Sequence, residues 1–261
     1  MNGIFSFTYD RPFVLFSPSH LVTLAVVLAA WVVVPLALRA VKSEDGRTRV
    51  RWILAAIMFL QHLSWHIWRI AAGQFDVKLH LPLELCAVTN FVCIVMLLTR
   101  KKTWYEVAYF WALAGAMEAI VTPDTRFAFP HFEYVQTYVH HGMLILAVLY
   151  MTVVERFRPT LRSIGKVAMI TNCYLVVIFV FNALIGSNYV FINRVPDFDT
   201  LVNVIVQVTG PWPWYVLGME VVGAVSCFLV YAPFGIMDLV RRSRGPGGRP
   251  QPALVSPGGT T

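Results

Sequence analysis

Long apolar runs are the feature of this chain that most limits its possible folds. Several stretches of about 18 residues or more hold almost no charge, and this is the length that crosses the hydrocarbon core of a bilayer as a helix. Apolar residues make up 57% of the 261 residues and charged residues only 13%, whereas a soluble domain carries about 25% charged residues. Backbone groups in lipid must be satisfied within the spanning segment, and no period-two alternation indicates strands. The sequence therefore predicts an all-α polytopic membrane protein.

Seven transmembrane helices are expected within a single domain that covers residues 1–240. Their boundaries lie at about 19–39, 51–73, 82–99, 103–121, 132–154, 163–186 and 213–239. A further short helix at about 196–208 has the spacing of a helix that lies on the membrane surface. Residues 241–261 are rich in Gly, Pro and Ser, so we expect a disordered tail. No basic region precedes the first long run, so no cleaved signal peptide is expected.

Basic residues alternate from loop to loop and predict the orientation. Sixteen Lys and Arg residues fall between spans one and two, three and four, and five and six, and in the tail, whereas four fall in the other segments and one, Arg69, lies inside a span. Cytoplasmic loops carry the excess of Lys and Arg, so the N-terminus is expected outside and the C-terminus in the cytoplasm. These loops also account for the net charge of +7 without a nucleic-acid partner. A bacterial plasma membrane is the expected location.

Polar side chains concentrate in the outer halves of the predicted spans. Ionisable groups in hydrocarbon are costly, so their one-sided placement predicts a polar cavity that opens toward the outer leaflet. The segment LPLELCAVTN at 81–90 opens one span and places a carboxylate and a thiol one turn inside it. The expected cavity residues are His62, His66, Arg69, Glu84, Cys86, Asn90, Glu118, His140, His141, Asn182, Tyr215 and Glu220.

A thiol at this depth supports acyl transfer when a histidine can take its proton. Cys86 would attack an ester carbonyl, His141 or His140 would manage the proton, and Asn90 would stabilise the oxyanion. The location makes a membrane phospholipid or lysophospholipid the expected partner, without a cofactor. The plainer interpretations are that Arg69 and Glu84 form a structural ion pair and that the histidines and cysteines are packing residues.

Six motifs together resemble a known family. They are FSPSH at 16–20, LPLELC at 81–86, TPD at 122–124, FPHFEYVQTYVHHG at 129–142, GSNYVF at 186–191 and GPWPWY at 210–215. This combination is similar to the YwaF-like bacterial membrane proteins and to the transmembrane protein 164 family. The resemblance implies a lipid acyltransferase with Cys86 as nucleophile and His141 as base. This chain departs from the bacterial pattern at Glu84, where that pattern more often has a His.

Two other functions fit the same residues. A zinc-dependent lipid hydrolase would use His62, His66 and either His140 or His141 as ligands, with an activated water as nucleophile. A transporter, proton-coupled carrier or sensor would also place His and Glu inside a seven-helix bundle. Stoichiometric zinc in the purified protein would support the hydrolase, and substrate flux into liposomes would support the carrier. The sequence leaves the lipid head group and the oligomeric state open.

Overall fold

The computed structural model describes residues 3–197 and 200–243, and within these ranges the secondary structure is helical. Helices account for 75% of the structure, and none of the described residues forms a strand. A single isolated bridge pairs Pro12 with Phe127. The helices are α1 (Pro18–Leu38), α2 (Glu44–Ala71), α3 (Val77–His80), α4 (Leu85–Thr99), α5 (Lys102–Trp111), α6 (Met117–Val121), α7 (Phe132–Val153), α8 (Leu161–Ile185), α9 (Leu201–Thr209) and α10 (Trp214–Ser243). Two short 3-10 turns, η1 (Gly3–Phe5) and η3 (Tyr189–Phe191), and a π-helical segment, η2 (Ala112–Ala116), complete them.

Helical structure occupies each of the seven positions expected from the apolar runs, with two differences. The helix expected at 103–121 is not continuous, because the π-helical turn η2 separates α5 from α6. The helix expected at 82–99 begins only at Leu85 and has 15 residues, which is shorter than the ~20 residues of a full crossing. The short helix expected at about 196–208 is present as α9. Helix α10 continues to Ser243, so the first three residues of the expected tail are helical, and the rest of that tail lies outside the described residues.

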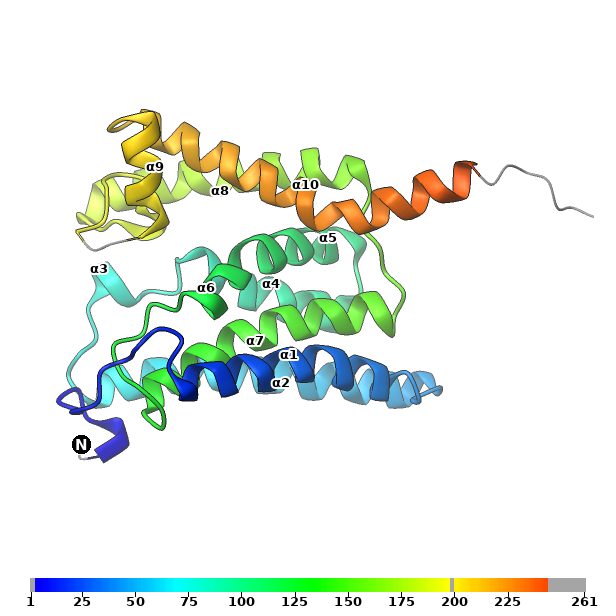
Figure 1. The fold of residues 1–261 in the computed structure, drawn as a ribbon, viewed down its shortest axis with the longest axis horizontal. Helices are drawn as coiled ribbons and strands as arrows, with labels where there is room; N and C mark the ends of the chain where they lie inside the picture. Colours follow the sequence, from blue (N-terminus) through cyan, green and yellow to red (C-terminus); the bar gives the residue numbers. More distant parts are fainter. Residues whose placement is uncertain (1–2, 198–199, 244–261) are drawn as a thin grey trace, which may run out of the picture.

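The helices form three layers (Figure 1). Helices α1, α2 and α7 make the first layer, α4, α5 and α6 the central one, and α8, α9 and α10 the third. Contacts link α2 and α7 to α4, α4 to α5, and α5 to α8, so the central layer joins the other two. This places the N-terminal ends of α4 and α7 and the C-terminal end of α2 at the same end of the bundle.

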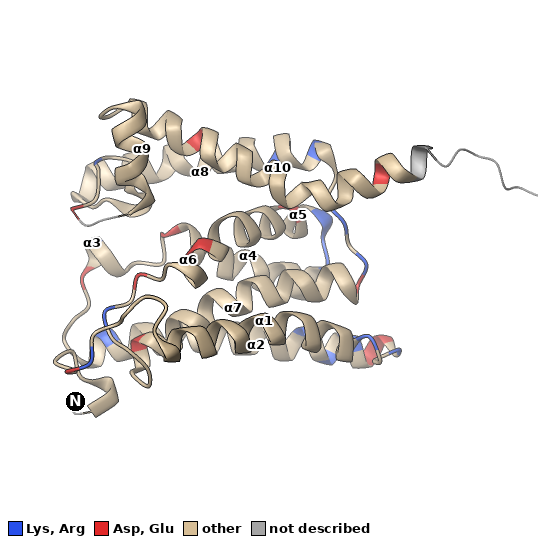
Figure 2. Cartoon of the chain, in the orientation of Figure 1, with Lys and Arg blue, Asp and Glu red and all other residues tan. Residues whose placement is uncertain are grey.

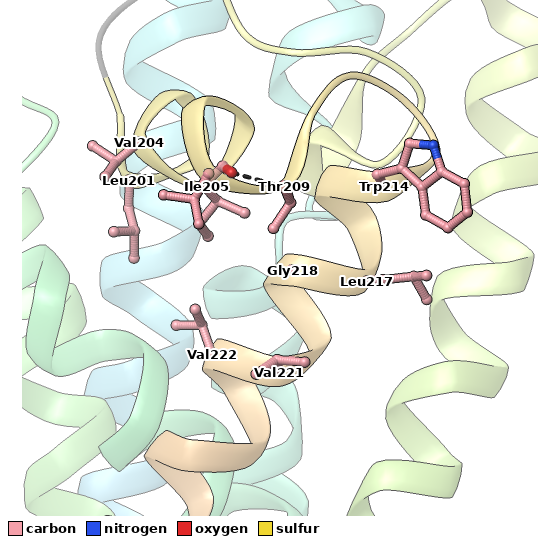
Figure 3. A pocket seen from close by; sticks show the side chains of 10 residues that line it. Leu201, Val204, Ile205, Thr209, Trp214, Leu217, Gly218, Val221 and Val222 are labelled. Atoms are coloured by element: carbon pink, nitrogen blue, oxygen red, sulfur yellow. Dashed lines mark hydrogen bonds between the residues drawn. The ribbon is translucent and has the colours of Figure 1, made fainter.

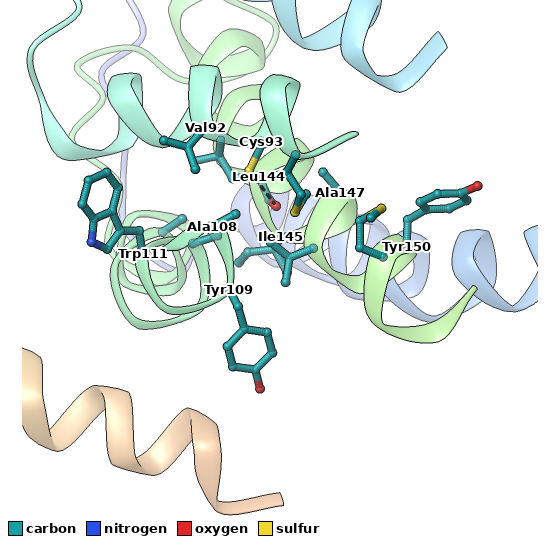
Figure 4. Packing of buried hydrophobic residues seen from close by; sticks show 14 of the residues in the cluster. Val92, Cys93, Ala108, Tyr109, Trp111, Leu144, Ile145, Ala147 and Tyr150 are labelled. Carbon is teal, nitrogen blue, oxygen red and sulfur yellow. Dashed lines mark hydrogen bonds between the residues drawn. The ribbon is translucent and has the colours of Figure 1, made fainter. Parts of the chain in front are cut away.

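The core lies between α4, α5 and α7 (Figure 4). Cys93 and Met96 of α4, Ala108 of α5, and Leu144 and Ala147 of α7 are completely buried there. Small residues let helix backbones approach closely, which drives helix association in lipid where the hydrophobic effect between helices is absent. The tight packing of this core fixes how α4 and α7 face each other.

Three helices have the length and composition of membrane-spanning helices. They are residues Pro18–Leu38, Leu161–Ile185 and Trp214–Val240, and only 11% of the most apolar window of each is buried. Their exposed faces carry Val, Leu and Phe side chains, as expected for surfaces that face lipid. Helix α4 is also apolar but has only 15 residues, and α5 has only 10, so neither is long enough to be counted with these three.

Charged side chains pair at the end of the bundle that holds the start of α2 and the end of α7 (Figure 2). Arg51 of α2 bonds Glu155 at 2.6 Å and Glu44 at 3.2 Å, and the side chain of Glu155 is only 1% exposed. Arg100, which follows α4, lies 2.8 Å from Glu44 and 2.9 Å from Glu155. These pairs tie α2, α4 and α7 together at the end rich in basic residues.

Replacing Arg51 with Met is expected to destabilise the folded protein. The change leaves the buried Glu155 carboxylate without its closest partner, which costs about 3–5 kcal/mol. Thermal unfolding in detergent measures the effect. The control is Arg158→Met, because the Arg158–Asp238 pair is 36% and 39% exposed and exposed pairs contribute about 0–1 kcal/mol. Equal losses in the two variants would contradict a structural role for the buried pair.

Candidate functional site

Cys86 lies in the first turn of α4, at an end that no side chain caps. Glu84 is the N-cap residue, yet its carboxylate makes no capping hydrogen bond. The first N–H groups of a helix have no acceptor within the helix, and the helix dipole adds partial positive charge there. The Cys86 thiol, which is half-buried, therefore sits beside main-chain donors that suit a negatively charged oxygen or sulfur.

Carboxylates from two segments lie close to this thiol. Glu84 and Glu118 are both within electrostatic range of Cys86. One oxygen of Glu84 accepts a hydrogen bond of 3.1 Å from the Val190 backbone N–H, so the loop after α8 holds this side chain. Tyr174 of α8 lies near Glu84 and Cys86, and its hydroxyl donates to the backbone oxygen of Leu83. Sequence reasoning missed Tyr174, although a tyrosine inside a predicted span was a usable signal.

Two neighbouring histidines of α7 approach from the opposite side. Their ring centroids are 4.9 Å apart and the rings are perpendicular, so His140 and His141 face different directions. The His141 Nδ1 atom lies 2.8 Å from the backbone oxygen of Thr137. The His140 ring lies against the backbone of Cys86. Among the described residues no hydrogen bond joins the Cys86 thiol to His141, so His140 is the histidine in direct contact with the Cys86 segment.

Three buried amides form a network that reaches His140 through Gln61, and they are the least expected part of the site. Gln61 of α2 contacts His140 Nδ1 at 2.9 Å and the Asn90 side-chain oxygen at 3.3 Å. Gln136 of α7 donates to the side-chain oxygen of Gln61 at 2.9 Å and also to its backbone oxygen. Asn90 is completely buried, and its amide nitrogen lies 3.4 Å from the Met58 backbone oxygen. Asn90 therefore belongs to this network.

Gln61 and Gln136 were absent from the sequence prediction, which took mainly ionisable groups and, of the amides, only Asn90 and Asn182. Uncharged amides inside predicted spans are a signal of the same kind, since an unsatisfied amide in hydrocarbon is also costly.

His62 and His66 of α2 extend the cluster toward the end of the helix. Their ring centroids are 4.7 Å apart, and His62 lies 5.9 Å from His140. The His66 ring nitrogens face the backbone oxygens of His62 and His80 at 3.0 and 3.1 Å, whereas the buried Nε2 of His62 has no hydrogen-bond partner. Within the described residues no group of three or more His, Cys, Asp or Glu side chains is arranged to hold a metal ion.

Arg69 does not pair with Glu84, the partner that its depth in the sequence indicated. Its guanidinium lies 4.0 Å from Glu133 of α7 and 2.9 Å from Nε2 of His80, and it stacks over Trp65 with 4.3 Å to the ring centroid. In the loop before α4, burial and then the charge of Arg69 lower the pKa of His80 to about 4. His80 is therefore neutral at pH 7, and its Nδ1 accepts a hydrogen bond of 2.8 Å from the Asp76 backbone N–H.

In the loop before α7, a carboxyl group has a raised pKa. Burial and then the charge of Glu133 raise the pKa of Asp124 above its ordinary value. Arg69, Glu133 and Asp124 thus form the charged rim of the site.

Three of the predicted cavity residues lie away from Cys86. Asn182 is buried and holds the loop after α8, where it bonds Ser187 at 2.6 Å and both backbone groups of Tyr189 at 2.9 Å. Tyr215 is buried and its hydroxyl donates to the Phe191 oxygen at 2.8 Å. Glu220 contacts Asn172 at 3.3 Å in a separate cavity of about 350 Å³ between α8 and α10. Asn182 and Tyr215 therefore position the loop that binds Glu84, and Glu220 belongs elsewhere.

An apolar pocket of about 610 Å³ lies between α9 and α10 (Figure 3). Side chains of Leu201, Ile205 and Val222 line it. Gly218 allows the close approach of the two helices, because a Cβ atom there would collide with Ile205 and Thr209. Cys86 is not among the residues that line this pocket, and apart from Thr209 the lining is mainly apolar.

The fold and the site together define an all-helical integral membrane protein with polar side chains gathered between its helices. The chain belongs to the TMEM164 family, whose sequence model matches residues 15–231. This agrees with the family resemblance of the six motifs. No curated protein and no solved structure matches the chain.

Replacing Asn182 with Ala is expected to lower the stability of the fold by at least about 2 kcal/mol. The change leaves the Ser187 hydroxyl and the Tyr189 N–H buried without partners, and each such group costs about 1–3 kcal/mol. Asn172→Ala is the matched control, because Asn172 is exposed and its loss is expected to cost about 0.5 kcal/mol or less. Thermal unfolding of the two variants in detergent measures the difference. Equal unfolding temperatures would contradict this role of Asn182.

Proposed function

We propose that this protein transfers or hydrolyses the acyl chains of membrane phospholipids, with Cys86 as the nucleophile and His141 as the base. The observation that carries the proposal is the position of Cys86 at the uncapped N-terminus of α4, where His140 lies against its backbone and His141 lies beside His140, in a bundle that faces lipid. Main-chain N–H groups of that first turn are suited to the oxyanion of a tetrahedral intermediate. This role was expected of Asn90, whose amide instead lies in the network with Gln61.

The hydrogen bond of His141 supports its role as a base. Its Nδ1 faces the Thr137 backbone oxygen, which only accepts hydrogen bonds, so Nδ1 carries the proton of the neutral ring. The lone pair is then on Nε2, as a general base requires. Glu84 and Glu118 place negative charge near the sulfur, so the thiol proton moves to His141 in the same step as the attack rather than before it.

The proposed reaction has two half-steps. The Cys86 sulfur attacks the ester carbonyl of a phospholipid while His141 takes the thiol proton. The ester C–O bond then breaks, His141 returns the proton to the lysophospholipid oxygen, and a thioester remains on Cys86. The hydroxyl of a lysophospholipid or a water attacks this thioester, with His141 again as the base, and restores the thiol.

The remaining pocket residues have a binding role in this proposal. His62, His66 and Arg69 line the route from the charged rim to Cys86, where Arg69 is suited to a lipid phosphate. Glu118 is exposed in the first turn of α6, within electrostatic range of Cys86. No step needs a metal or another cofactor.

We also propose seven spans, with the N-terminus outside and the C-terminus in the cytoplasm of a bacterial plasma membrane, and a single domain over residues 1–240. The alternation of basic loops and the helices at all seven positions support this topology. The site then opens toward the outer leaflet.

The variants Cys86→Ala and His141→Ala are expected to fold and to lose acyl transfer. The first removes the nucleophile and the second the base, and loss of a general base alone costs roughly 10²–10⁴ in rate. The measurement is the transfer of a labelled acyl chain from phosphatidylcholine to lysophospholipid, and to water, in vesicles that contain the purified protein. Cys173→Ala is the control, because the Cys173 side chain is exposed on α8 whereas that of Cys86 is half-buried. Full turnover in both site variants would refute the mechanism.

A periplasmic reporter enzyme fused after residue 243 is expected to be inactive, whereas a reporter that folds in the cytoplasm is expected to be active. The reason is that the loops rich in Lys and Arg share the side of the C-terminus. The opposite pattern in bacterial cells would overturn the orientation, and with it the assignment of the site to the outer leaflet.

A further inference from the structure

The amide network around His140 has only one consistent set of donors and acceptors. Its starting point is the backbone oxygen of Gln61, which can only accept a hydrogen bond. Gln136 contacts this oxygen through its side-chain amide, so Gln136 must present its NH₂ group there. The same NH₂ group lies 2.9 Å from the side-chain oxygen position of Gln61. Turning the Gln136 amide around would place two oxygens against each other.

The orientation of Gln136 then fixes that of Gln61. Because Gln136 donates to the Gln61 side-chain oxygen, the NH₂ group of Gln61 must point the other way, toward His140 Nδ1 at 2.9 Å and the Asn90 oxygen at 3.3 Å. A second backbone oxygen, at the Asn90 side of the network, supports the same orientation of the Gln61 amide. The Met58 carbonyl faces the Asn90 amide nitrogen, so Asn90 must turn its own oxygen toward Gln61.

His140 is consequently a hydrogen-bond acceptor at Nδ1. A neutral imidazole carries one proton, so a ring that accepts at Nδ1 is protonated at Nε2. His141, the next residue, has the reverse arrangement because its Nδ1 faces the Thr137 carbonyl. The two adjacent rings, perpendicular and 4.9 Å apart, therefore offer one proton donor and one proton acceptor.

We propose that Gln61 is a positioning residue that holds His140 as the Nε2-protonated tautomer, so that His140 donates a hydrogen bond at the Cys86 segment while the neighbouring His141 accepts a proton. The inference concerns the site of the proposed acyl transfer and assigns His140 as the donor of the pair. Gln136 and Asn90 fix the orientation of the Gln61 amide. Gln61, Gln136 and Asn90 are all buried, so water does not compete for their hydrogen bonds.

The test is the ¹⁵N NMR spectrum of the full-length protein, labelled at its seven histidines and reconstituted in dioleoylphosphatidylcholine vesicles. Protonated and unprotonated ring nitrogens have well-separated shifts, so the tautomer is read directly. His140→Gln and His141→Gln identify the two sets of signals. The expected result is an unprotonated Nδ1 with a protonated Nε2 for His140, and the reverse for His141.

Two substitutions test the part played by Gln61. In Gln61→Glu a carboxylate replaces the NH₂ donor, so the His140 proton is expected to move to Nδ1, whereas Gln207→Glu on the exposed surface of α9 is expected to leave the spectrum unchanged. A wild-type His140 protonated at Nδ1 would overturn the proposal, and so would a Gln61→Glu spectrum identical to wild type. If Gln61→Glu fails to fold, the wild-type tautomer alone decides.

Acyl transfer by the same samples separates the two proposals. If the tautomers are as inferred and the wild-type protein transfers no acyl chain, the proposed function fails while the assignment of Gln61 stands. If acyl transfer occurs with the opposite tautomers, the proposed function stands and the assignment of Gln61 fails.

Discussion

The absence of water from the hydrocarbon core is the constraint on which this structure depends. A polar side chain between the helices must find its partner on another helix, because lipid offers none. Gln61 of α2, Asn90 of α4 and Gln136 of α7 satisfy this requirement together, and their hydrogen bonds join these three helices. The polar interior therefore acts with the packed core of α4, α5 and α7 to fix the mutual positions of the helices.

The outer loops take part in the site because they supply hydrogen-bond partners to its polar groups. Asn182 bonds four partners in the loop after α8, and the same loop offers the Val190 N–H to the carboxylate of Glu84. The N-cap residue of α4 is thereby drawn away from its own helix. The first turn of α4, which carries Cys86, keeps its main-chain donors open for a ligand. The hydrogen bond between Val190 and Glu84 thus leaves the first turn of α4 uncapped beside Cys86.

Much of the fold could be predicted from the sequence, because apolar length and the placement of Lys and Arg are properties of the chain alone. The helix breaks were harder, since nothing local distinguishes the π-helical turn at Ala112–Ala116 from a continuous helix. The site was predicted in part. The depth of Cys86, His140 and His141 followed from counting residues along helices, whereas the pairing of Arg69 with Glu133 and not with Glu84 depends on how α2 and α7 rotate against each other.

By itself the sequence determined that this protein is built from apolar helices and that it belongs to a recognisable family, and it predicted similar depths for a thiol, carboxylates and histidines. Only the tertiary structure decided which of them meet. It joined two glutamines that carry no charge to His140, gave two adjacent histidines opposite hydrogen-bond partners, and moved Glu220 and Tyr215 away from Cys86. The physical reason is that helical periodicity fixes the depth and face of a residue, while packing alone fixes which face of a neighbouring helix it meets.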